Sequence, residues 1–336
     1  MAEARIALDA MGGDRAPQET VKGASEAVER DPELVVILVG DRDRVQAELD
    51  ELGVASDRLV IQHASQVVNS SDAPVEALRA KRDASIAVAS RMVAGKEVHA
   101  LVAAGSTGAA VAAGTLLIKL LPGVRRPGIA VTMPARQGKH TILCDAGANI
   151  TCKPLHLYHY GIMAARYAER ILGVSEPRVG LMNVGSEEVK GTSLVRETAE
   201  LFSRASLNYV GHIEGNDVFT GEVDVIVCEG FVGNVVLKVS EGLFDTIYGR
   251  FQEVAQGVRE AQGADMEDGL KGLMNAFKRR MDWAEHGGAP LLGLNGLVLI
   301  SHGRSDARAI RNAILQAAHQ HRSQVLEAMA EDLRAS

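Results

Sequence analysis

The sequence of 336 residues predicts an α/β fold in three layers (α/β/α), with a mainly parallel sheet between two layers of helices. Three observations predict it. Short aliphatic runs alternate with amphipathic helical stretches along most of the chain. The runs are apolar on both faces, as are strands that helices cover on both sides. Most runs are soon followed by Gly, Asp, Asn or Ser, which favour the turn from a strand into a helix. Such alternation implies right-handed crossovers.

Seven runs are predicted to be strands: Arg5–Leu8, Leu34–Val39, His99–Ala103, Gly128–Met133, Thr141–Cys144, Arg178–Asn183 and Asp224–Cys228. Four stretches between them have the periodicity of helices: Pro17–Arg30, Ser106–Leu121, His156–Leu172 and Ser193–Ser203. Ligands of parallel sheets bind beyond the carboxyl ends of the strands. We therefore expect the glycine-rich turns of this chain to meet at one edge of the sheet.

Residues 239–283 break the alternation, because their pattern is helical throughout. We expect two amphipathic helices joined by a polar tip, in a hairpin that belongs to a single catalytic domain of residues 4–330. The apolar stripes of an isolated hairpin need a cover, and the simplest one is the same hairpin of a second subunit. The last segment, Asp306–Arg334, is predicted to form one or two surface helices.

Composition excludes several classes of protein. The net charge of −7 argues against nucleic acid as the main partner. The three cysteines, Cys144, Cys152 and Cys228, have no C-x-x-C spacing, so we expect reduced thiols and no metal site. The first residues run straight into a predicted strand, and no apolar run reaches about 20 residues. We therefore expect a cytoplasmic protein that can still touch a membrane surface.

Two glycine-rich turns follow predicted strands and precede predicted helices. In the first, Asp9–Pro17, the paired Gly12 and Gly13 allow close approach of a backbone whose N–H groups can hold an anion. In the second, Ala103–Ala109, the hydroxyls of Ser106 and Thr107 can cap a helix or donate to a phosphate. The alternatives, a purely structural turn and capping alone, stay open for both.

Four further turns complete the set: Cys144–Ile150, Asn183–Gly191, Cys228–Asn234 and Gly287–Gly296, the last of which leads into Ile300–Gly303. Lys190 is either a solvated charge or an anion ligand at a strand end. His302 is either a general acid or base or a capping donor. The chain has no G-x-S-x-G elbow, which argues against a serine acyl-enzyme. It also lacks the phosphate loop of nucleoside triphosphatases.

Taken together and in this order, the segments resemble the PlsX family of acyl-acyl carrier protein:phosphate acyltransferases. The matching segments are Asp9–Pro17 (DAMGGDRAP), Ala104–Ala109 (AGSTGA), Asp145–Asn149 (DAGAN), Asn183–Gly191 (NVGSEEVKG), Glu229–Leu237 (EGFVGNVVL) and Gly288–Gly303 (GAPLLGLNGLVLISHG). They span nearly the whole chain. The family usually has AGNTGA where this chain has Ser106 in place of the asparagine.

The resemblance implies an isocitrate or isopropylmalate dehydrogenase-like (Rossmann-like) fold, shared with phosphotransacetylases, in a homodimer. It implies transfer of a fatty acyl group from acyl carrier protein to inorganic phosphate, without a cofactor or a metal. The acyl phosphate would then feed a membrane glycerol-3-phosphate acyltransferase at the start of phospholipid (phosphatidic acid) synthesis. We therefore expect peripheral contact with the inner face of the membrane.

The resemblance also supplies candidate site residues. Candidates for catalysis are Lys190, Asn234, Asn295 and His302, of which the asparagines would donate to the thioester oxygen. Candidates for phosphate binding are Asp9, Gly12, Gly13, Ser106, Thr107, Gly108 and Asn149. The basic cluster Lys278, Arg279 and Arg280 is the candidate docking patch for the acidic carrier protein. The alternative for this cluster is a solvated helix face.

Three competing functions remain. A phosphotransacetylase of the same fold would use acyl-coenzyme A. A decarboxylating dehydrogenase would need a metal-binding aspartate cluster and a nicotinamide site, and neither is recognisable. A lipid-responsive binding protein would keep the groove and have no turnover.

Overall fold

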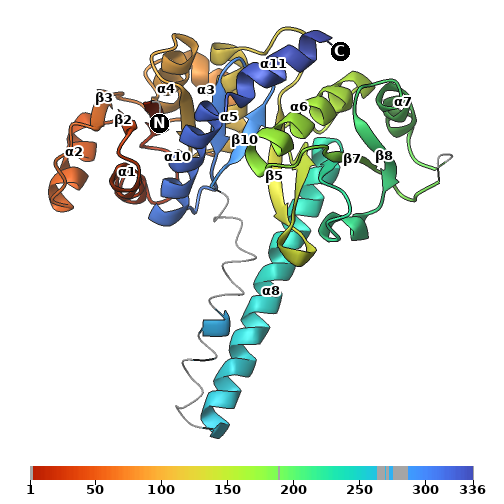
Figure 1. Cartoon of the computed structure of the whole chain (residues 1–336). Coiled ribbons are helices and arrows are strands. Elements are labelled where there is room, and N and C mark those ends of the chain that lie inside the picture. Colours follow the sequence, from red (N-terminus) through yellow and green to blue (C-terminus); the bar gives the residue numbers. More distant parts are fainter. Residues whose placement is uncertain (1–2, 188–189, 263–268, 270–271, 275–286, 336) are drawn as a thin grey trace.

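The computed structural model describes residues 3–187, 190–262, 269, 272–274 and 287–335, which form a layered α/β molecule around one 11-stranded sheet (Figure 1). The strand order is β3-β2-β1-β4-β11-β10-β5-β6-β9-β7-β8. The strands are β1 Ala4–Asp9, β2 Leu34–Gly40, β3 Leu59–His63, β4 Ala100–Ala103, β5 Gly128–Pro134, β6 His140–Cys144, β7 Arg178–Met182, β8 Asn208–Ile213, β9 Val225–Val227, β10 Ala289–Leu292 and β11 Leu297–Ile300.

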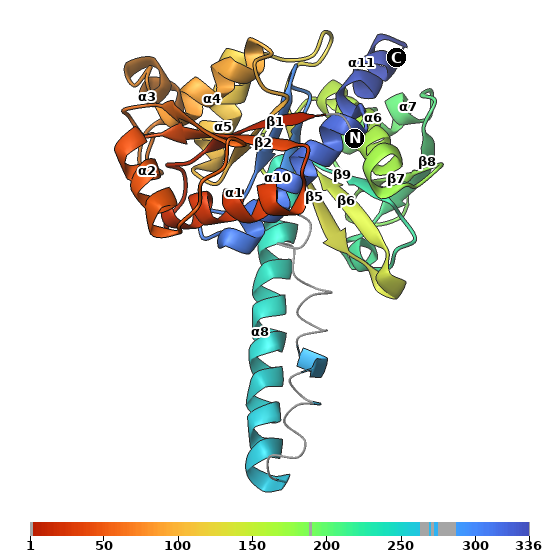
Figure 2. The same ribbon diagram turned by 60° about the vertical axis from the view of Figure 1, so that its left-hand side comes forward.

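Helices cover both faces of the sheet, so the predicted fold class is confirmed (Figure 2). The α-helices are α1 Gln18–Arg30, α2 Arg42–Glu51, α3 Pro74–Ala80, α4 Ser85–Ala94, α5 Thr107–Ala113, α6 Pro154–Leu172, α7 Ser193–Phe202, α8 Gly230–Gln262, α10 Ala307–Arg322 and α11 Val325–Ala335. A π-helical turn, Gly114–Ile118, prolongs α5. All seven predicted strands and all four predicted helical stretches are present.

The sheet consists of two parallel blocks that run in opposite directions. Strands β3, β2, β1, β4 and β11 are parallel to one another, and so are β6, β9, β7 and β8. Between the blocks, β10 is antiparallel to both β11 and β5, and β5 is antiparallel to β6. The expectation that the carboxyl ends of all strands lie at one edge of the sheet is therefore wrong, because the antiparallel strands β10 and β5 reverse the direction of the second block.

The register brings the carboxyl ends of the two blocks together. Ile300 at the end of β11 pairs with Ala289, and the next strands pair Leu291 with Ile129. Cys144 at the end of β6 pairs with Ala130, one residue beyond Ile129. Both blocks thus end at nearly the same level of the sheet, from opposite sides. The turns that follow β4 and β11 face the turns that follow β6 and β9.

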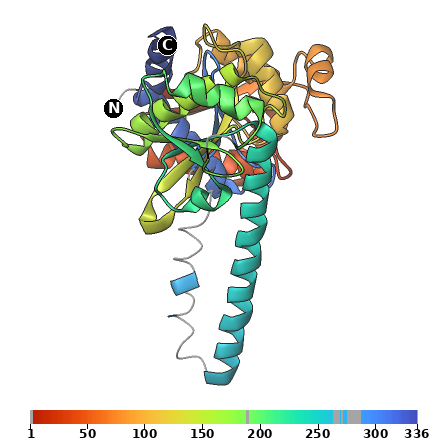
Figure 3. The same cartoon turned by 90° about the vertical axis from the view of Figure 1, so that its right-hand side faces the viewer.

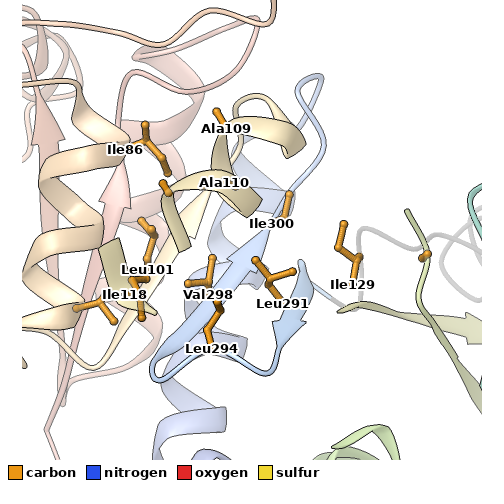
Figure 4. Close-up of a cluster of buried hydrophobic side chains, with 14 of the residues drawn as sticks. Ile86, Leu101, Ala109, Ala110, Ile118, Ile129, Leu291, Leu294, Val298 and Ile300 are labelled. Carbon is orange, nitrogen blue, oxygen red and sulfur yellow. The ribbon is translucent and has the colours of Figure 1, made fainter. Parts of the chain in front are cut away.

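A hydrophobic cluster spans the junction of the two blocks (Figure 4). Leu101 of β4, Val298 and Ile300 of β11, Leu291 of β10 and Ile129 of β5 all contribute buried side chains. On the same face, α5 presents alanines, whose small side chains let the helix approach the strands closely. This packing fixes the first turn of α5 against the end of β11.

Helix α8 leaves the body of the molecule and projects from it (Figures 1 and 3). It begins at Gly230, earlier than the expected start of the hairpin at residue 239. Most of the predicted second arm lies outside the described residues. Apolar side chains are exposed along α8, at Phe231, Val235, Val239, Leu243, Ile247 and Val254. None of the helices among the described residues has the length and apolarity that a bilayer span requires.

Candidate active site

A cavity of about 340 Å³ lies where the facing turns of the two blocks meet. Its lining residues come from four of the six glycine-rich turns, from strand β5 and from helix α8. They are Thr107, Ile129, Val131, Thr132, Ala146, Gly147, Ile150, Gly230, Phe231, Asn234, Leu237, Lys238, Glu241, Gly287, Gly288, Ala289, Ile300, Ser301 and His302. The fold therefore gathers segments that are almost 200 residues apart in the sequence, between Thr107 and His302.

Ser301 and His302 directly follow the last residue of β11, and both line the cavity. The backbone N–H of Ser301 donates to the carbonyl oxygen of Ala103 at 2.8 Å, which ties this turn to the end of β4. The Ser301 side chain is 4% exposed, and its hydroxyl has no partner among the described residues. A buried, unsatisfied hydroxyl in a cavity wall is a group that a polar ligand would satisfy.

His302 is held by its own turn. Its Nδ1 accepts from the backbone N–H of Arg304 at 3.2 Å. Burial lowers the pKa of His302, and the positive charges of Lys238 and Arg304 lower it further. The imidazole is therefore neutral at pH 7, and because Nδ1 is the acceptor, its proton is on Nε2, which can donate a hydrogen bond.

Helix α8 contributes Asn234 and, one turn later on the same face, Lys238. The helix can start so close to the sheet because of Gly233, whose added Cβ would collide with the carbonyl oxygen of Asp145. The Asn234 side chain also lies against Gly147, at 3.4 Å from the position of a Cβ there. Lys238 Nζ forms an ion pair of 2.8 Å with Glu241 and is half exposed. It is the lysine among the lining residues.

Ser106 and Thr107 divide the two roles that the sequence left open. The Ser106 hydroxyl caps α5 by accepting from the N–H of Ala109 at 3.4 Å. Thr107, the next residue, lines the cavity. Gly108 lies against α3, where a Cβ would be 3.1 Å from Pro74. Of these three predicted phosphate ligands, the structure thus brings Thr107 to the cavity.

Asn149 stabilises the turn after β6 and is not among the lining residues. Its Nδ2 donates to the Pro127 carbonyl at 2.6 Å and to the Tyr160 hydroxyl at 2.9 Å. Its backbone N–H donates to Asp145, at 2.8 Å. The buried Asp145 carboxylate also accepts from the N–H groups of Ile129, Gly147 and Ala148. Burial nevertheless raises the pKa of Asp145. This network holds Ala146, Gly147 and Ile150 in the cavity wall.

Asp9, Gly12 and Gly13 do not line the cavity but belong to a turn that contacts two of the lining turns. A Cβ on Gly12 would lie 2.8 Å from Asp9 Oδ2 and 3.0 Å from the backbone nitrogen of Gly105. Gly13 has a φ of +110°, and the N–H of the next residue, Asp14, donates to the Gly303 carbonyl at 2.8 Å. The first turn thus packs against the turns after β4 and β11 and is not itself part of the lining.

Three other predicted sites lie elsewhere. Lys190 follows β7 in an exposed turn and pairs with Glu187 at 2.7 Å. Asn295 is exposed in the turn between β10 and β11, at the end of these strands that points away from the cavity. Lys278, Arg279 and Arg280 lie outside the described residues. Sequence reasoning missed three lining residues, Lys238, Ser301 and Thr132. Lys238 could have been found from the sequence, because it follows Asn234 by four residues and so lies on the same face of a helix.

The cavity is amphiphilic. Its polar side chains are those of Thr107, Thr132, Asn234, Lys238, Glu241, Ser301 and His302, and apolar side chains of β5, β11 and α8 line it as well. Ile150 and Phe231, which are 75% and 63% exposed, lie where the cavity opens. Within the described part of the chain, no cluster of His, Cys, Asp and Glu could hold a metal ion. Such a cavity can hold a small anion beside an apolar chain.

Comparison with known proteins identifies relatives along the whole chain. Residues 4–328 match the family described as fatty acid synthesis protein. The phosphate acyltransferase of Syntrophotalea carbinolica is 47% identical over 310 residues, which cover 92% of this chain and 88% of the relative. That of Pelotomaculum thermopropionicum is 46% identical over 99% of this chain and 94% of its own.

Solved structures show where else the fold occurs. A phosphotransacetylase from Streptococcus pyogenes superimposes with a TM-score of 0.67 at 17% identity, over 95% of this chain and 94% of its own. A 4-hydroxythreonine-4-phosphate dehydrogenase from Klebsiella pneumoniae gives a TM-score of 0.54 at 14% identity, over 95% of this chain and 100% of its own. At these identities the likeness concerns the fold alone.

Proposed function

The chain belongs to the fatty acid synthesis protein family, and from this premise we propose that it moves a fatty acyl group from acyl carrier protein to inorganic phosphate. Its relatives establish the coarser statement, that it is a phosphate acyltransferase, and confirm the resemblance drawn from the six turns. The observation that carries the proposal is the amphiphilic cavity, which an unsatisfied buried hydroxyl and a lysine line together with apolar side chains.

The chemistry requires no covalent catalyst, because phosphate is itself a nucleophile. One phosphate oxygen attacks the carbonyl carbon of the thioester, and a tetrahedral intermediate carries the negative charge on the former carbonyl oxygen. Collapse of this intermediate breaks the C–S bond. The thiolate of the carrier leaves and takes up one proton, and the acyl phosphate remains. The protein must remove water from the phosphate, aim it and stabilise the oxyanion.

Five of the polar side chains that line the cavity have a task in this proposal. The hydroxyls of Thr107 and Ser301 donate to the phosphate oxygens, and Lys238 offsets their charge. Asn234 donates its side-chain N–H to the thioester oxygen, as an oxyanion hole does. The neutral His302, whose Nδ1 accepts from the Arg304 N–H, carries its proton on Nε2 and donates it to the leaving thiolate, and the proton released by the attacking phosphate restores the imidazole.

The apolar side of the cavity receives the first carbons of the acyl chain. Its volume of about 340 Å³ is at the lower end of the range for ligand cavities, roughly 300–1,000 Å³. A long acyl chain therefore continues past Ile150 and Phe231 onto the surface of α8. The product is released near a membrane, where a glycerol-3-phosphate acyltransferase consumes it in phosphatidic acid synthesis.

The test is to mix long-chain acyl carrier protein with phosphate and to trap the acyl phosphate with hydroxylamine. We expect the hydroxamate to form in proportion to enzyme and to require phosphate, and Ser301→Ala to raise the KM for phosphate. A parallel arm supplies acetyl-coenzyme A in place of the acyl carrier. Turnover confined to the coenzyme A ester would make the protein a phosphotransacetylase, and no turnover in either arm would favour the binding protein.

A further inference from the structure

Three cationic side chains gather around the start of α6, next to the turn after β6 that lines the cavity with Ala146, Gly147 and Ile150. Arg125 and Arg126 precede β5, and Lys153 caps the start of α6. All three are exposed, and none has a salt bridge to an acidic side chain in the described ranges. This free positive charge stands out in a chain whose net charge is −7.

Hydrogen bonds place the three cations on one surface. The Pro127 carbonyl, next to Arg126, accepts from Asn149 Nδ2 at 2.6 Å and from the Tyr160 hydroxyl at 3.4 Å. The segment before β5 is therefore fixed to the turn after β6 and to helix α6, which Lys153 begins. The pKa of the buried His156 on α6 reports the same proximity: burial lowers it most, and the charges of Arg126, Lys153 and Arg125 lower it further.

The acidic side chains of the adjoining turns are occupied. Asp145 accepts backbone N–H groups inside the turn after β6. Glu229 accepts from the N–H groups of Phe231 at 2.6 Å and of Val232 at 3.2 Å, at the start of α8. Each carboxylate is held by the backbone, and neither neutralises the cations. Two apolar side chains complete the surface, Ile150 with 75% and Leu155 with 38% exposure.

We propose that Arg125, Arg126, Ile150, Lys153 and Leu155 form the docking surface for the acidic carrier protein that brings the acyl thioester. The inference rests on the proposed function. Charge complementarity selects the occupant, because an acidic partner is repelled by the net charge of this chain and needs a local cationic surface. Position supports it as well. Ile150 both belongs to this surface and lines the cavity, so a docked carrier would deliver its thioester at the cavity mouth.

The test is the double charge reversal Arg125→Glu/Arg126→Glu in the full chain, with Kd for the carrier protein measured at low salt. We expect Kd to rise about tenfold and its dependence on ionic strength to weaken, as for rim charges that steer association. Lys22→Glu/Arg170→Glu is the matched control, since it makes the same charge change at exposed positions of α1 and at the far end of α6. This control should leave Kd unchanged.

A small-thiol ester of the same fatty acid separates docking from chemistry. The double variant should use this ester and phosphate with the kcat of the unmodified enzyme. An unchanged Kd for the carrier would overturn the proposal, as would an equal loss in the control. Loss of binding to anionic phospholipid vesicles with an unchanged carrier Kd would assign the surface to the membrane and also overturn it. Carrier binding without any acyl phosphate formation would leave the docking surface standing and reject the proposed function.

Discussion

Two lysines of this chain allow the role of charge at the site to be tested at the scale of single residues. Lys190, which the sequence singled out, and Lys238, which it did not, each pair with a glutamate three residues away and are equally exposed, at 51% and 50%. They differ in position, because Lys238 lines the cavity. We expect Lys238→Ala to raise the KM for phosphate about tenfold, since one charge at an anion is removed.

Lys190→Ala is the matched comparison and should change this KM little. Steady-state kinetics with varied phosphate at saturating acyl donor measures both variants. A larger effect at Lys190 than at Lys238 would restore the sequence-based candidate and remove Lys238 from the site.

Asp9 gives the stability of the protein a predictable dependence on pH. Burial raises the pKa of this carboxyl from 3.8 to about 6 and outweighs the nearby Ser85 hydroxyl and the N–H groups of Met11 and Gly12. The folded state thus binds the proton more tightly than the unfolded state. Protonation of Asp9 therefore stabilises the folded state. This stabilisation is complete below pH about 4 and is lost as the pH rises through about 6. Above pH 6 the ionised group costs about 3 kcal/mol.

Asp9→Asn removes the charge and keeps a side chain that accepts hydrogen bonds. We expect this variant to be more stable than the unmodified protein at pH 8, by up to about 3 kcal/mol, and no more stable at pH 4. Urea unfolding at the two pH values measures the difference. A gain of the same size at both values would contradict the assignment to ionisation.

Sequence reasoning at this scale identified the turns better than the side chains within them. Ser106 and Thr107 are adjacent hydroxyls in the same motif, and the helix geometry alone makes the first a cap and the second a lining residue. Asn149 has a side chain suited to a ligand, and three partners within the protein already occupy it. Such assignments depend on contacts from distant segments, which no local pattern records.

At the scale of elements, the sequence pattern did not reveal where helix α8 begins. The glycines of EGFVGN indicated a turn, and the structure places Gly230 and Gly233 in the first turn of a helix that lies against the turn after β6. Strands β10 and β11 were also read as part of a glycine-rich segment. At the start of α8, glycine allows close packing between backbones, whereas propensity alone assigns it to a turn.

The exposed apolar side chains of α8 predict how the molecule associates. Val239, Leu243 and Ile247 are 64%, 55% and 48% exposed at successive positions four residues apart. Burial of such a stripe is favourable, so we expect a homodimer in solution that forms through α8. Leu243→Glu should shift the protein towards the monomer in sedimentation velocity, and Gln252→Glu, at an exposed polar position of the same helix, should not. A monomeric unmodified protein would refute this mode of association.

At the scale of the whole molecule, the sequence predicted the layers and left the direction of the strands undetermined. Apolar runs and helices alternate in the same way whether a block of strands runs up or down the sheet. The reversal arises at β10 and β5, where short antiparallel strands replace a crossover. As a consequence, the cavity lies between two opposed sets of turns, and the proposed substrates would be held from both sides.

The most direct test of this account is a crystal of the protein soaked in inorganic phosphate. We predict one phosphate ion in the cavity, within hydrogen-bond distance of the Ser301 hydroxyl and the Thr107 hydroxyl and beside Lys238. Phosphate bound only at other positions, with these three side chains free of it, would contradict the central claim that the facing turns hold the nucleophile.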